Sequence, residues 1–441
     1  MSFIRALIGI TFFLGLAYLF SSRRDKIDWR LVLTGLSLQM GLGLLLIGGA
    51  QYDGESQFVK TLLSVVPSMF DWVSQRFVVI LGYTAEGSRF IFGDLVNSKS
   101  MGFIFAVNVL PTVIFFSTLT AGLYYLGILQ IVVKGIAWVM AKTMRLSGAE
   151  SLSAAGNIFL GQTEAPLLVK PFVPNMTRSE LMCLMTGGMA TIAGGVLASY
   201  VGMLGGDSPE QQARFASYLL SASVLNAPAA IILSKMMIPE LDKENVDTSL
   251  SVNSETLGTN LIDALANGAS DGLKLALNIG GMLLAFIALI AALNGLLGWV
   301  GGWTGLNDII AASTGGQFGA LSMEYILGQV FRIFAFAMGV DWAESSLVGS
   351  LVGTKLVVNE FVAYSGLQEY IGEGSLNSKS IIISTYALCG FANFSSIAIQ
   401  IGGIGGMAPT QQGNISKLGF KALFAATIAT MLTATIAGAF F

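Results

Sequence analysis

Eight apolar runs of about 20 residues constrain this 441-residue chain more than any other feature. A helix needs about 20 consecutive apolar residues to cross the hydrocarbon core of a bilayer. Only 11% of the residues are charged, whereas soluble domains carry about 25%. We therefore expect an all-α integral membrane protein with eight transmembrane helices, at residues 3–20, 31–50, 103–127, 180–204, 214–238, 274–298, 380–404 and 417–440.

Five further stretches are apolar but too charged or too short to cross. Charged residues interrupt residues 57–95, 128–146 and 321–340, which we interpret as amphipathic interfacial helices. Residues 149–173 and 343–368 are apolar runs with polar centres. We expect both to be re-entrant hairpins, which enter and leave the membrane on one side.

Lysine and arginine predict the orientation, because cytoplasmic loops are enriched in them. The loop after the first apolar run contains Arg23, Arg24, Lys26 and Arg30, so we place it in the cytoplasm. Eight crossings from there put the other basic clusters on the same side, and both termini outside.

The order of elements indicates two inverted repeats. Residues 1–100 hold the N-terminal spanning helices and an interfacial helix, and residues 101–240 form the first repeat. A cytoplasmic linker and an entry helix follow at 241–273, and 274–441 form the second repeat. Both hairpins begin with Ala-Glu-Ser, and the repeats start on opposite sides of the membrane. Inverted repeats with broken segments are typical of secondary transporters.

Two acids lie where a bilayer disfavours them. Glu164 lies in "GQTEAP" at the centre of the first hairpin, and Glu360 lies in "NEFVAYS" in the second. An ionisable group at this depth costs about 2.5–3.5 kcal/mol on insertion scales, so such groups face a cavity or a partner. Exposed backbone at the tip is tolerated only beside a cavity. We therefore expect both acids to line a binding site.

The helices after the hairpins carry polar breaks. Asn393 and Ser396 are three residues apart, and we expect them to share one helix face. With two acids, several neutral groups and no positioned arginine, the site favours a neutral polar substrate. Side-chain oxygens of Asn157 and Thr191, and the carbonyls of Leu160 and Ile192, suit a hard cation. Sodium is the better guess, because without histidine a proton-coupled mechanism would have to use an acid.

The composition argues against other classes. The net charge of −3 gives no basic surface for nucleic acid. The chain has no histidine, no zinc-protease motif and no serine with a recognisable base, so we do not expect an enzyme or an organic cofactor. An amino-acid transporter should show an arginine for the substrate carboxylate. The remaining alternative is that the protein is a channel. Uptake of the substrate against its gradient would exclude that alternative.

Four stretches resemble the concentrative nucleoside transporter family, in its bacterial sodium-coupled branch: "GNIFLGQTEAPLLVKPF", "GGMATIAGG", "NEFVAYS" and "CGFANFSSIAI". The resemblance covers residues 100–440, and residues 1–50 resemble extra N-terminal helices of bacterial members. It implies a homotrimeric sodium–nucleoside symporter with an elevator-like mechanism in the bacterial cytoplasmic (inner) membrane, surrounded by lipid. The alternative is a proton-coupled nucleoside symporter.

The resemblance also implies the role of each site residue. The residues that would bind the nucleobase are Gln162, Thr163, Glu164 and Val196. Those that would hold the ribose are Glu360, Phe391, Asn393 and Ser396. Those that would coordinate sodium are Asn157, Leu160, Thr191 and Ile192. Thr191 stands where some relatives have serine, which keeps the hydroxyl ligand.

Overall fold

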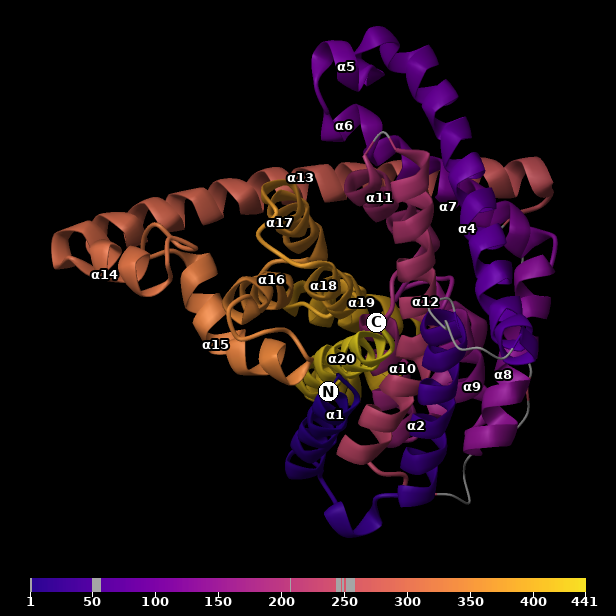
Figure 1. The fold of residues 1–441 in the computed structure, drawn as a ribbon. Coiled ribbons are helices and arrows are strands. Elements are labelled where there is room, and N and C mark those ends of the chain that lie inside the picture. The colour runs from indigo at the N-terminus through magenta and orange to yellow at the C-terminus, as the bar shows by residue number, and fades with distance from the viewer. Residues whose placement is uncertain (1, 50–56, 207, 243–246, 248–249, 251–257) are drawn as a thin grey trace.

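The computed structural model describes residues 2–49, 57–206, 208–242, 247, 250 and 258–441, and every regular element within them is a helix (Figure 1). Part of the expected linker lies outside the described residues. The first half contains α1 (Ser2–Leu19), α2 (Trp29–Gly43), α4 (Gln57–Phe92), α5 (Ser98–Met101), α6 (Phe105–Asn108), α7 (Leu110–Tyr125), α8 (Ile128–Met144), α9 (Gly148–Gly156), α10 (Arg178–Ala190), α11 (Gly194–Gly205) and α12 (Pro209–Met237). The second half contains α13 (Leu261–Thr304), α14 (Leu306–Ser313), α15 (Met323–Ala337), α16 (Ser345–Val357), α17 (Glu360–Glu373), α18 (Ser378–Leu388), α19 (Phe394–Met407) and α20 (Gln412–Phe440).

Six helical segments in the described part of the chain are long and apolar enough to cross a membrane. They are Trp29–Gly48, Phe105–Tyr125, Arg178–Gly205, Pro209–Met237, Leu261–Thr304 and Pro409–Phe440. Each coincides with an expected transmembrane helix. Of the other two expected spans, 3–20 is occupied by α1, whose apolar part Phe3–Leu19 is shorter than these six segments, and the 380–404 run is divided into α18 and α19. The total of eight therefore stays a prediction.

The expected interfacial stretches are helical. Residues 57–95 form mainly one helix, α4, which packs along α12 and against Leu44–Gly48, the π-helical segment that follows α2. α8 buries Leu129, Val133, Ala137 and Met140 at helical spacing, and its exposed face mixes Lys134 and Lys142 with apolar side chains such as Ile131 and Trp138. The placement of these helices at a membrane surface stays a prediction.

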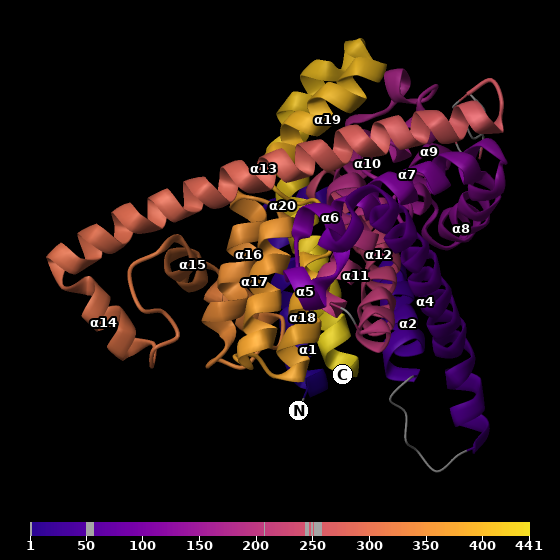
Figure 2. The same cartoon turned by 90° about the horizontal axis from the view of Figure 1, so that it is seen from above.

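The core of the molecule is a bundle of α10, α12, α18 and α20, which pack against one another. By contrast, only 17% of the most apolar window of α13 is buried. This long helix runs across the outside of the molecule in Figures 1 and 2 and packs along α7. A β-carbon on Gly268 would lie 2.6 Å from Ala121 Cβ, so glycine permits this close approach.

Both expected hairpins have two arms that pack on each other. In the first, α9 contacts the 3-10 turn Ala165–Val169, with Gly156 against Leu168. The return arm is thus made of 3-10 turns. In the second hairpin, α16 packs on α17. α9 also contacts α10, and α16 contacts α18, so each hairpin lies against the broken helix that follows it.

Candidate functional site

The two broken helices meet at their breaks. The Phe391 N–H donates to the Thr191 carbonyl at 3.3 Å, although the residues are far apart in the chain. Asn226 of α12 donates to the carbonyls of Ala190 and Cys389, both at 2.8 Å. These carbonyls have no partner within their own helix, because α10 and α18 end there. Asn226 therefore supplies a hydrogen-bond donor to the backbone at both breaks. The polar centre of the protein is assembled around this crossing.

The tip of the first hairpin points its side chains in two directions. Gln162 is buried, and its Nε2 donates to Ser396 Oγ at 3.0 Å. Thr163 and Glu164 are exposed to a cavity of about 440 Å³, which Val196 also lines. Across this cavity lies α13, with the exposed ion pair of Lys274 and Asp271. The structure therefore joins Gln162 to α19 and turns Thr163 and Glu164 towards α13.

Glu360 is the first residue of α17 and is 4% exposed. Its Oε1 accepts from the Tyr200 hydroxyl at 2.9 Å, and its Oε2 accepts from Asn393 Nδ2 at 3.0 Å. Asn393 precedes α19 and caps it, since its Oδ1 accepts from the Ser396 N–H at 2.9 Å. Our expectation of a shared helix face was wrong, because Asn393 lies outside the helix. The two residues nevertheless meet.

The structure brings four of the eight predicted substrate residues into one connected polar group. The connection runs from Gln162 through Ser396 and Asn393 to Glu360. Phe391 is half-buried and joins through its backbone to Thr191. None of Glu360, Phe391, Asn393 or Ser396 lines the cavity beside Glu164. The open cavity therefore reaches Thr163, Glu164 and Val196, whereas Gln162, Glu360, Asn393 and Ser396 are buried away from it.

Two of the four predicted sodium residues, Asn157 and Thr191, lie beside Gly187 of α10. Asn157 is fully buried, and neither amide atom has a hydrogen-bond partner among the described residues. Its Nδ2 would lie 3.0 Å from a β-carbon on Gly187, and Thr191 Oγ1 donates to the Gly187 carbonyl at 2.9 Å. Leu160 and Ile192 are also buried.

A buried amide without a partner costs about 1–3 kcal/mol. An oxygen-binding cation beside Asn157 would remove this penalty, because it would accept the amide oxygen as a ligand. The hydroxyl of Thr191 and the backbone freed by the break add further oxygen atoms nearby. The donor set consists of neutral oxygens and therefore fits sodium.

Sequence reasoning missed three side chains of this centre. Tyr200 donates to Glu360, Asn226 joins the two breaks, and Gln400 donates to the Met185 carbonyl at 3.0 Å. All three are fully buried. The signal that could have found them is a polar side chain within an otherwise apolar helical run.

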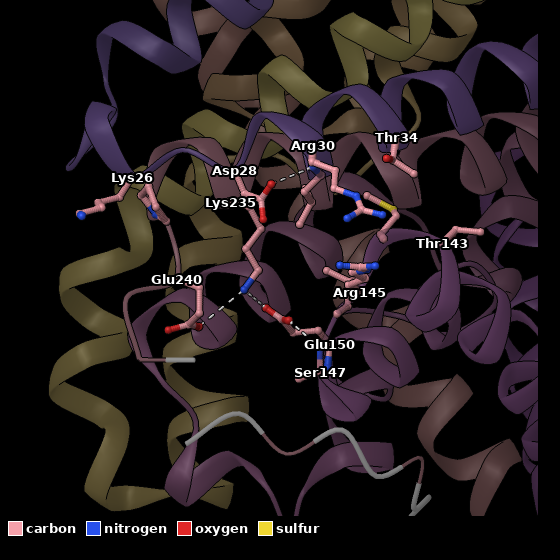
Figure 3. Close-up of a pocket in the computed structure, with 14 residues that line it drawn as sticks. Lys26, Asp28, Arg30, Thr34, Thr143, Arg145, Ser147, Glu150, Lys235 and Glu240 are labelled. Atoms are coloured by element: carbon pink, nitrogen blue, oxygen red, sulfur yellow. Dashed lines mark hydrogen bonds and ion pairs between the residues drawn. The ribbon is translucent and has the colours of Figure 1, made fainter. Parts of the chain in front are cut away.

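A second cavity, of about 340 Å³, is lined by parts of α2, α8, α9 and α12 (Figure 3). Lys235 forms an ion pair with Glu150 and lies 3.7 Å from Glu240. The Lys235 ammonium also donates to Ser179 Oγ at 3.0 Å. These bonds fasten the start of the first hairpin to the end of α12. None of the predicted site residues lines this cavity, so we assign it a structural role.

Three protein-family models match the chain. The model described as Na+ dependent nucleoside transporter C-terminus matches residues 218–438, and the corresponding N-terminus model matches residues 8–95. A model described as Nucleoside recognition matches residues 106–207. Together they include both hairpins and both broken helices.

Individual relatives point to the same family as these models. An uncharacterized transporter of Haemophilus influenzae is 42% identical over 100% of this chain and 98% of its own length. Rat sodium/nucleoside cotransporter 2 is 38% identical over 98% of this chain, which covers 62% of that longer protein.

A solved structure of CNTnw, titled as inward-facing and substrate-bound, matches with a TM-score of 0.86 and 37% identity, covering 100% of this chain and 98% of that one. Structures of CNTnw variants titled as outward-facing and as an intermediate state match with TM-scores of 0.86 and 0.88. The fold, the acid-and-amide centre and these similarities agree, and this chain belongs to the concentrative, Na+-dependent nucleoside transporter family.

Proposed function

We propose that this protein is a symporter that uses a sodium gradient to concentrate nucleosides inside the cell. The observation that carries the proposal is the polar group from Gln162 to Glu360, which lies at the crossing of the two breaks. Its side chains are one acid and several neutral donors and acceptors. Such a group matches an uncharged molecule with hydroxyls and a hydrogen-bonding ring. Membership of the family supports the nucleoside as substrate.

We assign the residues around this group to three parts of the site. The nucleobase would contact Gln162, Thr163, Glu164 and Val196, which lie at or near the open cavity. The ribose would contact Glu360, Phe391, Asn393 and Ser396, because a carboxylate can accept from two neighbouring hydroxyls. Sodium would bind Asn157, Leu160, Thr191 and Ile192. The partnerless amide of Asn157 supports the ion site.

The proposed architecture has eight transmembrane helices, two re-entrant hairpins and inverted repeats at 101–240 and 274–441. Residues 1–100 would add N-terminal helices, and 241–273 would form the cytoplasmic linker and entry helix. The matching order of hairpin, broken helix and long helix in both halves supports the repeats. The protein would lie in the bacterial cytoplasmic membrane.

We also propose an elevator-like movement, in which the hairpins and core bundle move against a scaffold containing α7 and α13. The loose attachment of α13 to the core supports this division. α13 exposes large apolar side chains, including Leu284 at 77% and Trp303 at 83%. Lipid or neighbouring subunits of a homotrimer would cover such a surface.

Uptake into proteoliposomes tests the proposed function. We expect an inward sodium gradient to drive accumulation of radiolabelled uridine or adenosine above the external concentration. An inward proton gradient at equal sodium on both sides should not. Accumulation driven by protons alone would contradict sodium coupling, and flux that only equilibrates the nucleoside would contradict symport.

Replacing Gly161 with alanine should raise the nucleoside KM. The new β-carbon would fall against Glu164 Oε2 and would lie 3.2 Å from Ala193 Cβ, so the carboxylate must move. Displacing one charged hydrogen bond costs about 1.5–3 kcal/mol, which corresponds to roughly tenfold or more in KM. The matched control is Gly202→Ala in α11, where the new methyl group has no neighbour within 4 Å. An unchanged KM in Gly161→Ala would contradict the role of Glu164.

A further inference from the structure

A buried lysine lies in the second hairpin, close to the crossing of the breaks. Lys355 of α16 is 2% exposed. Its ammonium donates to the Ala387 carbonyl of α18 at 2.9 Å and to Thr430 Oγ1 of α20 at 3.1 Å. An ammonium at membrane depth is costly, and a neutral donor could make the same two bonds. Glu360 of α17 interacts electrostatically with this ammonium, but it makes no hydrogen bond to it among the described residues, so both bonds of Lys355 go to neutral oxygens.

The two broken helices give a common register for the repeats. α10 follows the capping residue Thr177, and α18 follows the capping residue Asn377. Aligning the two caps places Gly187 opposite Ala387, as the tenth residue of each helix. The same register places Thr191 opposite Phe391, the two residues whose backbones are hydrogen-bonded. The two breaks are therefore hydrogen-bonded to each other at aligned positions of the two repeats.

Corresponding carbonyls of the two repeats have different surroundings. In the first repeat, the Gly187 carbonyl accepts from Thr191 Oγ1, and the partnerless amide of Asn157 lies beside Gly187. This is the proposed sodium site. In the second repeat, the Ala387 carbonyl accepts the Lys355 ammonium. In each repeat, a polar side chain of the preceding hairpin lies at this tenth residue of the broken helix, Asn157 beside Gly187 and Lys355 on the Ala387 carbonyl.

We infer that the ammonium of Lys355 is a tethered cation, which fills in the second repeat the position that sodium takes in the first. The inference rests on the proposed sodium site. An ammonium and a sodium ion are both monovalent, and both bind carbonyl and hydroxyl oxygens. With Lys355 in place, the second hairpin is held to α18 and α20 without an ion from solution. The protein therefore couples one sodium ion to each nucleoside.

The ratio of ion to substrate flux tests this inference on the unmodified protein. Proteoliposomes receive 22Na+ and tritiated uridine together, and initial fluxes are compared. We expect a ratio of one and a Hill coefficient for sodium of about one. A ratio of two would overturn the inference while leaving sodium-coupled symport intact. Uptake that ignores sodium would overturn both proposals.

Replacing the lysine should create a second cation requirement. In Lys355→Ala, the oxygens of Ala387 and Thr430 lose their cation, and a vacant space remains beside them. We expect uptake at low sodium to fall at least about tenfold, as for loss of a charged hydrogen bond. High sodium should restore it with a Hill coefficient near two, and methylammonium should restore it with a coefficient near one.

Two comparison variants distinguish a lysine that acts as a tethered cation from one that only holds neighbouring helices together. Lys355→Met fills the same space without a charge, so neither methylammonium nor high sodium should restore its uptake. Lys379→Ala, at the start of α18, the helix whose Ala387 carbonyl accepts from Lys355, should behave as wild type. A folded Lys355→Ala protein with an unchanged Hill coefficient and no response to methylammonium would overturn the inference. Should that variant fail to fold, the flux ratio of the wild-type protein still decides.

Discussion

Replacing Glu360 with glutamine should weaken nucleoside binding more than any other single change considered. The carboxylate accepts from Tyr200 and Asn393 and is almost wholly buried, so its remaining lone pairs serve the proposed ribose site. Glutamine replaces one acceptor oxygen with an NH2 donor, which would face another donor. Loss of bonds to a buried charge costs about 1.5–3 kcal/mol each, so two lost ribose bonds predict roughly 100-fold or more in Kd.

Binding of radiolabelled uridine to purified protein measures this effect, and deoxynucleosides locate it. Wild-type protein should bind 2′- and 3′-deoxyuridine more weakly than uridine, whereas Glu360→Gln should lose most of this preference. The control is Glu369→Gln, because Glu369 lies exposed on the same helix α17. A variant that loses affinity but still prefers uridine equally would show that Glu360 does not bind the ribose.

Replacing Asn157 with leucine should abolish the response to sodium and also stabilise the sodium-free protein. Leucine has nearly the same shape as asparagine but leaves no partnerless amide at this position. Removing that amide should raise the free energy of unfolding without sodium by about 1–3 kcal/mol. Sodium at 100 times its Kd should stabilise wild-type protein by about 2.7 kcal/mol, and the variant should not respond.

Thermal unfolding in detergent, with sodium or with choline as the cation, measures both effects, and uptake assays measure the loss of coupling. The control is Asn175→Leu, at an exposed position at the end of the same hairpin. A purely structural asparagine would give the opposite result, since its replacement would lower stability equally in both salts. Sodium stimulation that survives in Asn157→Leu would reject the ion site.

The pattern of apolar runs predicted the all-helical class and the positions of most helices, because a bilayer permits few other structures for such runs. A run of about 20 apolar residues has few alternatives in lipid, so six expected spans match helices of the structure. Glycines around Thr191 likewise predicted the break between α10 and α11. The 3-10 return arm of the first hairpin was not predictable, because its geometry depends on packing against α9 rather than on local preference.

The candidate site was predictable only as a set of residues. Glu164, Glu360 and Asn157 stood out because lipid disfavours them. Their partners did not, because Tyr200 lies 160 positions from Glu360 and chain order carries no signal for that pairing. Lys355 lies only five positions before Glu360 in the sequence. Its hydrogen-bond acceptors, Ala387 and Thr430, nevertheless belong to two other helices.

The hydrogen bond from Gln162 to Ser396 has a consequence for biosynthesis. The two residues are 234 positions apart, so at roughly 5–20 residues per second a ribosome needs about 10–50 seconds between them. During that time the first hairpin tip is made but has no partner in the second repeat. The newborn chain must therefore hold a polar tip in or near the bilayer, shielded by water, lipid head groups or an insertion factor. Membrane quality control would meet this protein first as a half-built transporter with its binding site still open.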